Sequence, residues 1–304
     1  MSTGRPKIGL GMTSVGTPIR RATAIAPAAA TIQWRGVHIR MTSRYRHYRC
    51  GVSESGAISI FPVRGLPEIE HGADLAAMIV DAARVAGTPV EDGDVVIITS
   101  KIVSKAEGAA IELESVIPSA FAKRWATEWD KDPRVVEVVL AESRRIVRQV
   151  GPVLITETHH GFVCANSGVD QSSSGAAGRV VVLPSDPDAS ARGIRQRFAD
   201  LGVQVAIVIS DTFGRPWREG QTDVCIGVGG IAPIRSYIGE VDPHGHEFRV
   251  QELCVVDEIA AAAELVKGNT SRIPVAVVRG VDYVVDDAAT MAPVLRDTSR
   301  DLFR

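Results

Sequence analysis

A short apolar run that ends in polar residues constrains the fold of this chain most strongly. Residues 205–209 read Val-Ala-Ile-Val-Ile, which predicts a buried strand. The run is followed at once by Ser210-Asp211-Thr212, and then by a Gly, a Pro and a second Gly with Arg215 and Arg218 between them. Open α/β sheets bind ligands at the ends of such strands. We therefore predict that the strand ends at Ser210 and that a ligand site begins there.

The residues after this run suit two kinds of ligand. Asp211 and Thr212 offer the oxygen donors that hard divalent cations prefer, and two nearby arginines are suited to clamping phosphate. The alternative is an ordinary turn at Asp211, with both arginines in solvent. This stretch alone leaves both interpretations open.

Composition narrows the class of protein. Of the 304 residues 45% are hydrophobic and 23% are charged, as in soluble globular domains, and no apolar run approaches the roughly 18 residues of a membrane span. The four cysteines are widely separated and form no C-x-x-C pair. This spacing argues against a zinc knuckle and a disulfide framework, and it predicts a cytoplasmic protein.

The charge is distributed unevenly along the chain. Residues 1–53 carry nine Lys or Arg and no Asp or Glu; without these nine cations the net charge of −2 becomes −11. An acidic body predicts no nucleic-acid partner, because the phosphate backbone requires a basic face. We interpret residues 1–55 as a basic, disordered extension and residues 56–304 as the folded domain.

Two further segments carry polar side chains after predicted strands. Residues 95–98 form a second buried strand, which leads into Thr99-Ser100-Lys101-Ile102-Val103-Ser104-Lys105. Its hydroxyls and lysines suit nucleotide phosphates, although no Walker loop precedes it, and a solvated lysine-rich turn is the alternative. Asp170 lies in a Ser-rich segment and is the natural second carboxylate for a cation held by Asp211, unless that segment is only a flexible loop.

The remaining pattern interleaves helices and strands. We predict a helix capped by Asp74, a long helix from Asp132-Pro133 to Val150, and a helix capped by Asp188. Strands are predicted at 153–156, 161–165, 179–183 and 275–278, and a helix at 256–266 that ends at Gly268. The glycines at 227–230 predict a close backbone approach, and His159-His160 a solvated turn rather than a metal site. The fold class is therefore α/β, or mixed α+β.

Taken in order, several of these segments resemble the coenzyme F420-0:γ-glutamyl ligase family. The resemblance runs from about Ile58 to Phe303, and its most specific part is the string from Asp211 to Asp223, D-T-F-G-R-P-W-R-E-G-Q-T-D. The other segments that carry it are Gly65-Leu66-Pro67-Glu68-Ile69, residues 99–105, Gly168-Val169-Asp170, Leu265-Val266-Lys267-Gly268 and Pro274–Gly280.

The resemblance implies a GTP-dependent ligase that adds L-glutamate to coenzyme F420-0. It implies an intertwined homodimer of the mixed α/β fold of this family, which needs Mg²⁺ or Mn²⁺ and K⁺. By position, Asp170 and Asp211 would bind one metal and Thr212 a second. GTP would contact Leu66, Pro67, Glu68, Ile69, Ser100, Lys105, Ser173, Lys267 and Gly268.

The chemistry of such a reaction assigns further roles. A carboxylate becomes reactive toward an amine only after activation, here by phosphoryl transfer from GTP to give an acyl phosphate. Lys105, and Arg215 or Arg218, would balance charge on the transferred phosphoryl group. The arginines would alternatively hold the phosphodiester of the substrate or the carboxylates of glutamate, and the sequence does not decide between these roles.

The chain also departs from the family pattern. Ser173 stands where an Asn often contacts GTP, and Asn269 stands where an acidic residue can bind the second metal. The flavin-binding domain that follows in actinobacterial members is absent from these 304 residues, so the number of glutamates added is open. Two other functions remain: a different nucleotide-dependent acid–amine ligase or kinase, and a non-catalytic GTP-binding protein on the same scaffold.

Overall fold

The computed structural model describes residues 56–171 and 178–301. The predicted extension at 1–55 and the GTP contact predicted for Ser173 lie outside the described residues, so both stay predictions.

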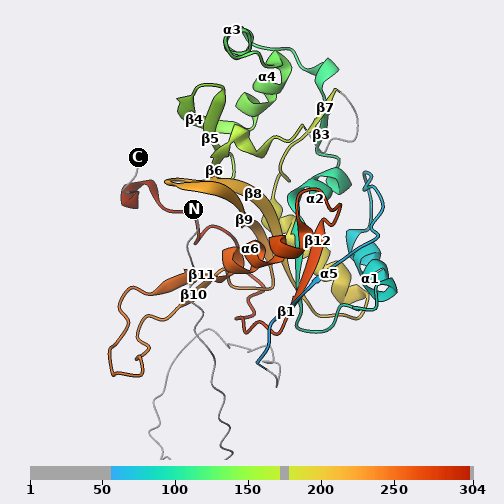
Figure 1. Cartoon of the computed structure of the whole chain (residues 1–304), viewed down its shortest axis with the longest axis vertical. Helices are drawn as coiled ribbons and strands as arrows, with labels where there is room; N and C mark the ends of the chain where they lie inside the picture. Colours follow the sequence, from blue (N-terminus) through green and yellow to red (C-terminus); the bar gives the residue numbers. More distant parts are fainter. Residues whose placement is uncertain (1–55, 172–177, 302–304) are drawn as a thin grey trace, which may run out of the picture. The chain divides into compact units, whose positions relative to one another are not determined.

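A five-stranded sheet forms the centre of the described fold (Figure 1). Its strand order is β1 (Ser59–Pro62), β12 (Val275–Arg279), β2 (Val95–Thr99), β8 (Ala206–Arg215) and β9 (Arg218–Gly229). The pair β2–β8 is parallel, and the other neighbouring pairs are antiparallel. Strands β2 and β12 and the first half of β8 are almost fully buried runs of Val, Ile and Ala, as expected for strands covered on both faces.

Helices cover this sheet and their ends follow the local sequence. They are α1 (Leu75–Val85), α2 (Ser100–Glu107), α5 (Pro187–Asp200) and α6 (Val255–Lys267). In Figure 1, α6 crosses in front of the sheet and α5 lies behind it. Asp74 accepts a hydrogen bond from the Ala77 amide and so caps α1, and Gly268 ends α6, both as predicted. The cap of α5 is Asp186, not the predicted Asp188, whose carboxylate instead binds the amides of Val228 and Met291.

The prediction that the central strand ends at Ser210 is wrong. Strand β8 continues to Arg215, turns at Pro216-Trp217, and returns as β9 with Arg215 opposite Arg218. The polar residues are therefore strand residues of a hairpin, because β9 supplies their antiparallel hydrogen-bond partners. Strand β2 does end here, since its last residue Thr99 pairs with Ser210. Asp211 and Thr212 thus lie just past the carboxyl end of a parallel pair, which is where the ligand site was predicted.

The middle of the chain forms a smaller region with its own apolar clusters. Its elements are β3 (Ala110–Glu112), α3 (Ala120–Trp129), α4 (Pro133–Ala141), β4 (Ser143–Val150), β5 (Val153–Thr158), β6 (Val163–Ala165) and β7 (Arg179–Val181). The predicted pairing of β5 with β6 is confirmed. The predicted helix from 133 to 150 is wrong beyond Ala141, because residues 143–150 pair with β5 as a strand instead. The apolar residues Ile146 and Val150 fit a helical stripe, but strand pairing overrides that pattern.

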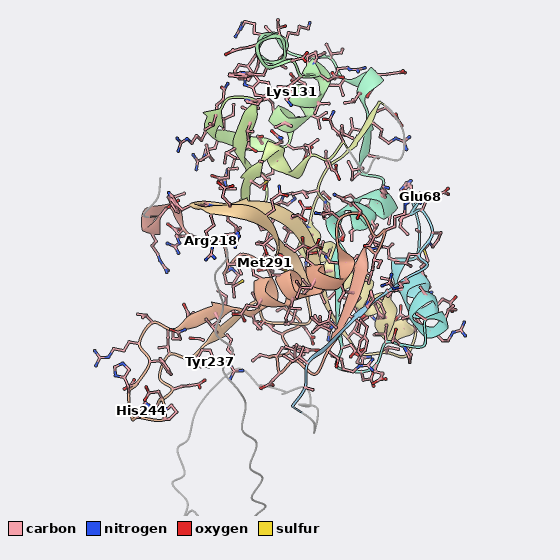
Figure 2. All side chains as sticks on the ribbon, in the orientation of Figure 1. Glu68, Lys131, Arg218, Tyr237, His244 and Met291 are labelled. Atoms are coloured by element: carbon pink, nitrogen blue, oxygen red, sulfur yellow. The ribbon has the colours of Figure 1, made fainter. Side chains whose placement is uncertain are left out.

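Beyond β9 the chain forms a two-stranded arm from β10 (Ile234–Ser236) and β11 (Glu252–Cys254). The segment between these strands extends away from the central sheet, and Tyr237 and His244 mark it in Figure 2. In the part of the chain that the structure describes, no helix combines the length and apolarity needed to cross a bilayer.

The predicted close approach at the glycine cluster is confirmed and leads to a test. A Cβ at Gly227 would lie 2.5 Å from the backbone carbonyl of Pro187, at the start of α5. We expect Gly227→Ala to lower the free energy of unfolding by about 1–3 kcal/mol, because α5 would have to shift. Urea unfolding of both proteins measures this difference.

Gly193→Ala in α5 is the matched control for this prediction. Nothing lies within 4 Å of a Cβ there, so this substitution should be neutral or should stabilise the helix by roughly 0.5–1 kcal/mol. Equal stability of the two variants would contradict the close packing of α5 on β9.

Candidate active site

A cavity of about 800 Å³ opens at the carboxyl end of β2. It brings together segments that are far apart in sequence: residues 66–69, the start of α2, the hairpin β8–β9, the end of α6 and the loop that follows it. Its lining residues are Leu66, Pro67, Glu68, Ile69, Thr99, Lys101, Ile102, Lys105, Thr212, Asp223, Glu264, Lys267, Gly268, Asn269, Thr270, Arg272, Ile273 and Pro274. Of the eight predicted GTP contacts that lie in the described residues, seven line this cavity and Ser100 does not.

The N-terminal half of the lining pairs a loop with α2. Lys105 forms an ion pair with Glu68, and the Lys105 side chain is only 15% exposed whereas that of Glu68 is 73% exposed. The loop 66–69 therefore contacts α2 through an ion pair at the cavity wall. This position suits Lys105 to an anionic ligand, which would compete with Glu68 for the ammonium group.

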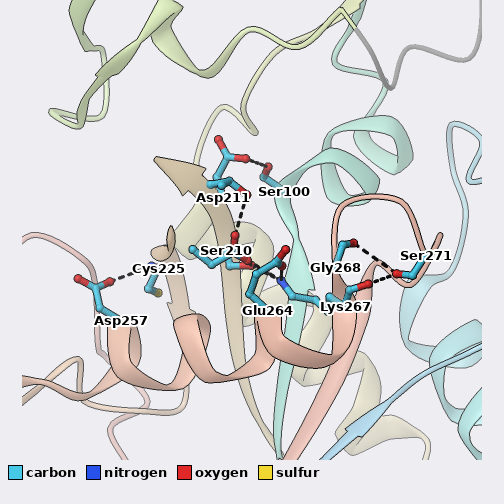
Figure 3. A network of polar contacts seen from close by, with 11 residues as sticks. Ser100, Ser210, Asp211, Cys225, Asp257, Glu264, Lys267, Gly268 and Ser271 are labelled. Atoms are coloured by element: carbon cyan, nitrogen blue, oxygen red, sulfur yellow. Dashed lines mark hydrogen bonds and ion pairs between the residues drawn. The ribbon is translucent and has the colours of Figure 1, made fainter. Parts of the chain in front are cut away.

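Asp211 lies on the side of β8 that faces α2. Its Oδ1 accepts a hydrogen bond from Ser100 Oγ at 3.2 Å, which Figure 3 shows. Burial raises the pKa of Asp211 to about 6, and the negative charge of Asp223 adds to the shift. The Thr212 amide, the charge of Lys101 and the Ser100 hydroxyl oppose that shift without cancelling it. The carboxylate thus has less positive charge around it than a buried anion requires.

Asp170 and Asp211 share one cationic neighbour. Lys101 Nζ lies 2.8 Å from Asp170 Oδ2, and its charge also acts on Asp211. Asp170 is placed by an isolated bridge in which its amide and carbonyl bond to Val181. The two carboxylates predicted to hold one cation therefore both lie near the Lys101 ammonium. Neither is among the residues that line the cavity, whereas Lys101 is.

A second polar cluster lies on the other side of β8. Thr212 and Asp223 are direct cross-strand partners, and Asp223 accepts hydrogen bonds from Thr212 Oγ1 at 2.7 Å and from Ser210 Oγ at 2.9 Å. Lys267 Nζ lies 2.6 Å from Asp223 Oδ2 and donates to Ser210 Oγ at 2.9 Å. Figure 3 shows Ser210 and Lys267 together here, away from Asp211. The Lys267 ammonium is therefore already bonded within the protein.

Glu264 lies at the edge of this cluster. Its carboxylate is 3.7 Å from Lys267 Nζ and lines the cavity. Burial and the nearby charge of Asp223 raise the pKa of Glu264. The loop after α6 is held by Ser271, whose hydroxyl donates to the backbone carbonyls of Lys267 and Gly268.

Arg215 and Arg218 are not brought into the cavity. They flank the turn of the β8–β9 hairpin, and the Arg215 guanidinium donates to the backbone carbonyls of Glu219 and Gly220 in the same hairpin. Figure 2 shows Arg218 well apart from Glu68 at the cavity wall. Their predicted catalytic roles stay predictions.

Of the cations of the lining, the sequence analysis named Lys101 only as one of the lysines of residues 99–105 and did not name Arg272. Lys101 had a usable signal, since it lies one helical turn before Lys105 and such pairs share a face. Arg272 had none, because its place in the loop depends on how α6 ends. Asp223 and Glu264 were also unassigned, although Asp223 closes the most specific string of the sequence.

Comparisons with known proteins identify the family of this chain. Residues 65–280 match the family model described as F420-0:Gamma-glutamyl ligase. The chain belongs to this family. The ligase is 40% identical over 250 residues to a protein of Methanothermobacter thermautotrophicus named coenzyme F420:L-glutamate ligase, covering 81% of this chain and 99% of that protein. It is 43% identical over 253 residues to the protein of the same name from Methanopyrus kandleri, covering 81% and 98%.

Proposed function

We propose that this ligase uses GTP to join L-glutamate to coenzyme F420-0 through an acyl phosphate. Family membership and the shared name of its relatives support the acceptor and the amino acid. The nucleotide and the intermediate are the finer part of the proposal, and they rest on the chemistry of the cavity.

The assembly of the cavity lining is the observation that carries this proposal. Residues 66–69, Lys101, Lys105 and the loop 268–274 surround one space of about 800 Å³, which is large enough for a nucleotide. Lys101, Lys105 and Arg272 supply positive charge on that lining, as a triphosphate requires. The lining also holds three acidic residues: Asp223 and Glu264 lie near Lys267, and Glu68 forms an ion pair with Lys105.

The donor set fits a divalent cation. The carboxylates of Asp170 and Asp211 both lie near the Lys101 ammonium, and burial raises the pKa of Asp211 because too little positive charge surrounds it. In residues 56–171 and 178–301 no three His, Cys, Asp or Glu side chains form a metal-binding group. A cation held by Asp170 and Asp211 would take its other oxygens from nucleotide and water, as Mg²⁺ commonly does. Thr212, whose hydroxyl lies on the other side of β8, would bind a second cation. When bound, Mg²⁺ or Mn²⁺ would neutralise charge on the phosphates.

The residues of the chain would position the reactants and balance charge. The substrate carboxylate attacks the γ-phosphorus and the bond to GDP breaks; the glutamate amine then attacks the acyl carbon, loses a proton, and inorganic phosphate leaves. Lys105, freed from Glu68, would hold the γ-phosphate during the first step, and Lys101 would offset the added negative charge.

Mass spectrometry tests this function directly. The full chain is incubated with coenzyme F420-0, L-glutamate, GTP, Mg²⁺ and K⁺, and the product is expected to gain one glutamyl residue while phosphate is released. The number of residues gained also counts the glutamates added. Product formation with ATP but not GTP would overturn the nucleotide assignment, and phosphate release without a glutamyl product would overturn the ligation.

Lys105→Met is expected to weaken GTP binding by about 10–100-fold, because one charge-assisted hydrogen bond is lost from the cavity wall. Isothermal titration with GTP and Mg²⁺ measures the change. Lys131→Met removes a lysine from an exposed position of the smaller region and serves as the control. Equal GTP affinity of the Lys105→Met variant and the original chain would exclude Lys105 from the nucleotide site.

We also propose that the ligase is a cytoplasmic homodimer. The arm between β10 and β11 exposes three apolar side chains, Ile238, Val241 and Val250, and Val250 is 87% exposed. Burial of such residues against a second copy would be favourable. Light scattering is expected to give twice the 32.4 kDa of one chain, and a monomeric mass would contradict the proposal. The described cysteines Cys164, Cys225 and Cys254 are free thiols, which fits a reducing compartment.

A further inference from the structure

Thr212 lines the cavity, but the hydrogen of its hydroxyl group is used in a hydrogen bond to Asp223. Thr212 Oγ1 donates to Asp223 Oδ1 at 2.7 Å. A hydroxyl carries one hydrogen and two lone pairs, so this oxygen has only lone pairs left for a ligand. It therefore repels phosphate oxygens and accepts a cation or a hydrogen-bond donor.

Lys267 and Ser210 fix the direction of that hydrogen bond. Asp223 is 3% exposed, and its other oxygen accepts from both Lys267 Nζ and Ser210 Oγ. The Lys267 ammonium lies 2.6 Å from Asp223 Oδ2, and a carboxylate paired with an ammonium group accepts hydrogen bonds through its oxygens. Thr212 must then be the donor. Because Thr212 and Asp223 are cross-strand partners on a hairpin, the backbone holds the two groups in register.

We propose that Asp223, held by Lys267 and Ser210, is a positioning residue that turns Thr212 into a ligand for a divalent cation. This inference rests on the proposed function, in which a cation accompanies the nucleotide. It also gives Lys267 a role different from direct phosphate binding, since both acceptors of its ammonium are buried protein groups. Asp223 itself would act through Thr212 and not through contact with the substrate.

Mn²⁺ affinity, measured by electron paramagnetic resonance with a non-hydrolysable GTP analogue, tests the inference without relying on turnover. Binding of Mn²⁺ to the analogue alone is subtracted. Thr212→Val removes the lone pairs and is expected to weaken Mn²⁺ binding about 10–100-fold, whereas Thr212→Ser should keep the original Mn²⁺ affinity.

The double variant Asp223→Asn with Lys267→Met avoids an unpaired buried charge. It is expected to weaken Mn²⁺ binding about 10-fold, because the amide of Asn can donate to Thr212 Oγ1 and reverse the direction of that hydrogen bond.

The decisive measurement combines these substitutions in one protein. If Asp223 acts through Thr212, adding Asp223→Asn and Lys267→Met to Thr212→Val causes no further loss of Mn²⁺ affinity. A full additional loss, or unchanged affinity in the Thr212→Val variant, overturns the inference. If the double variant does not unfold cooperatively, Ser210→Ala replaces it, because this substitution removes one of the hydrogen bonds that hold Asp223. Ser210→Ala is expected to weaken Mn²⁺ binding a few-fold, and again only when Thr212 is present.

The two failures are distinguishable. An original chain that binds no Mn²⁺ overturns both the cation of the proposed function and this inference. An original chain that binds Mn²⁺ and forms product, with variants that bind Mn²⁺ equally well, overturns this inference alone.

Discussion

Asp211→Asn is expected to lower the rate of ligation by about 10²–10³-fold or more while leaving the protein folded. The substitution keeps the shape of the side chain and its contact with Ser100, but it removes the negative charge that would hold the cation. Steady-state phosphate release with saturating GTP, F420-0 and glutamate measures the effect. Asp81→Asn, at an exposed ion pair with Arg84 on α1, is the control and should retain full activity.

The stability of this variant separates function from structure. The folded chain raises the pKa of Asp211 from its ordinary value near 3.8 to about 6, so the folded state favours the protonated form. The stability that this preference provides is lost as the pH rises from about 3.8 to about 6. At pH 7.5 the ionised carboxylate lowers the free energy of unfolding. Removing the charge should leave the melting temperature unchanged or higher. A parallel fall in melting temperature and activity would return Asp211 to a structural role.

Lys267→Met is expected to have the largest effect on stability, a loss of about 3–5 kcal/mol in the free energy of unfolding. The ammonium is 2% exposed and is the closest positive charge to Asp223, so its removal leaves a buried carboxylate uncompensated. Urea unfolding measures the change. Lys123→Met, at an exposed position of α3, should change stability by less than about 0.5 kcal/mol.

A second substitution completes this test. Adding Asp223→Asn to Lys267→Met removes both charges and is expected to recover most of the lost stability, because apolar or neutral replacements of a buried ion pair are often neutral. If the double variant is as unstable as Lys267→Met alone, the cost comes from lost packing of the lysine stem and the ion pair is not the cause.

The ligase family and the strongest elements could be predicted from the sequence because they depend on local patterns. Strands β2, β12 and the first half of β8 are buried apolar runs, and α1 and α6 carry their caps within a few residues of their ends. The string from Asp211 to Asp223 identified the family, which residues 65–280 confirm. Periodicity misled only where a strand partner lay nearby, as at 143–150, where pairing with β5 replaced the expected helix.

The sequence by itself determined which side chains were available: two carboxylates at Asp170 and Asp211, lysines after β2, and a hydroxyl at Thr212. Only the tertiary structure decided which of them meet. It placed Asp211 and Thr212 on opposite sides of β8, turned Arg215 and Arg218 away to a hairpin end, and buried Lys267 against Asp223. The physical reason is that β9 extends the ladder beyond Ser210, so side chains alternate across the sheet where the sequence alone predicted a strand end.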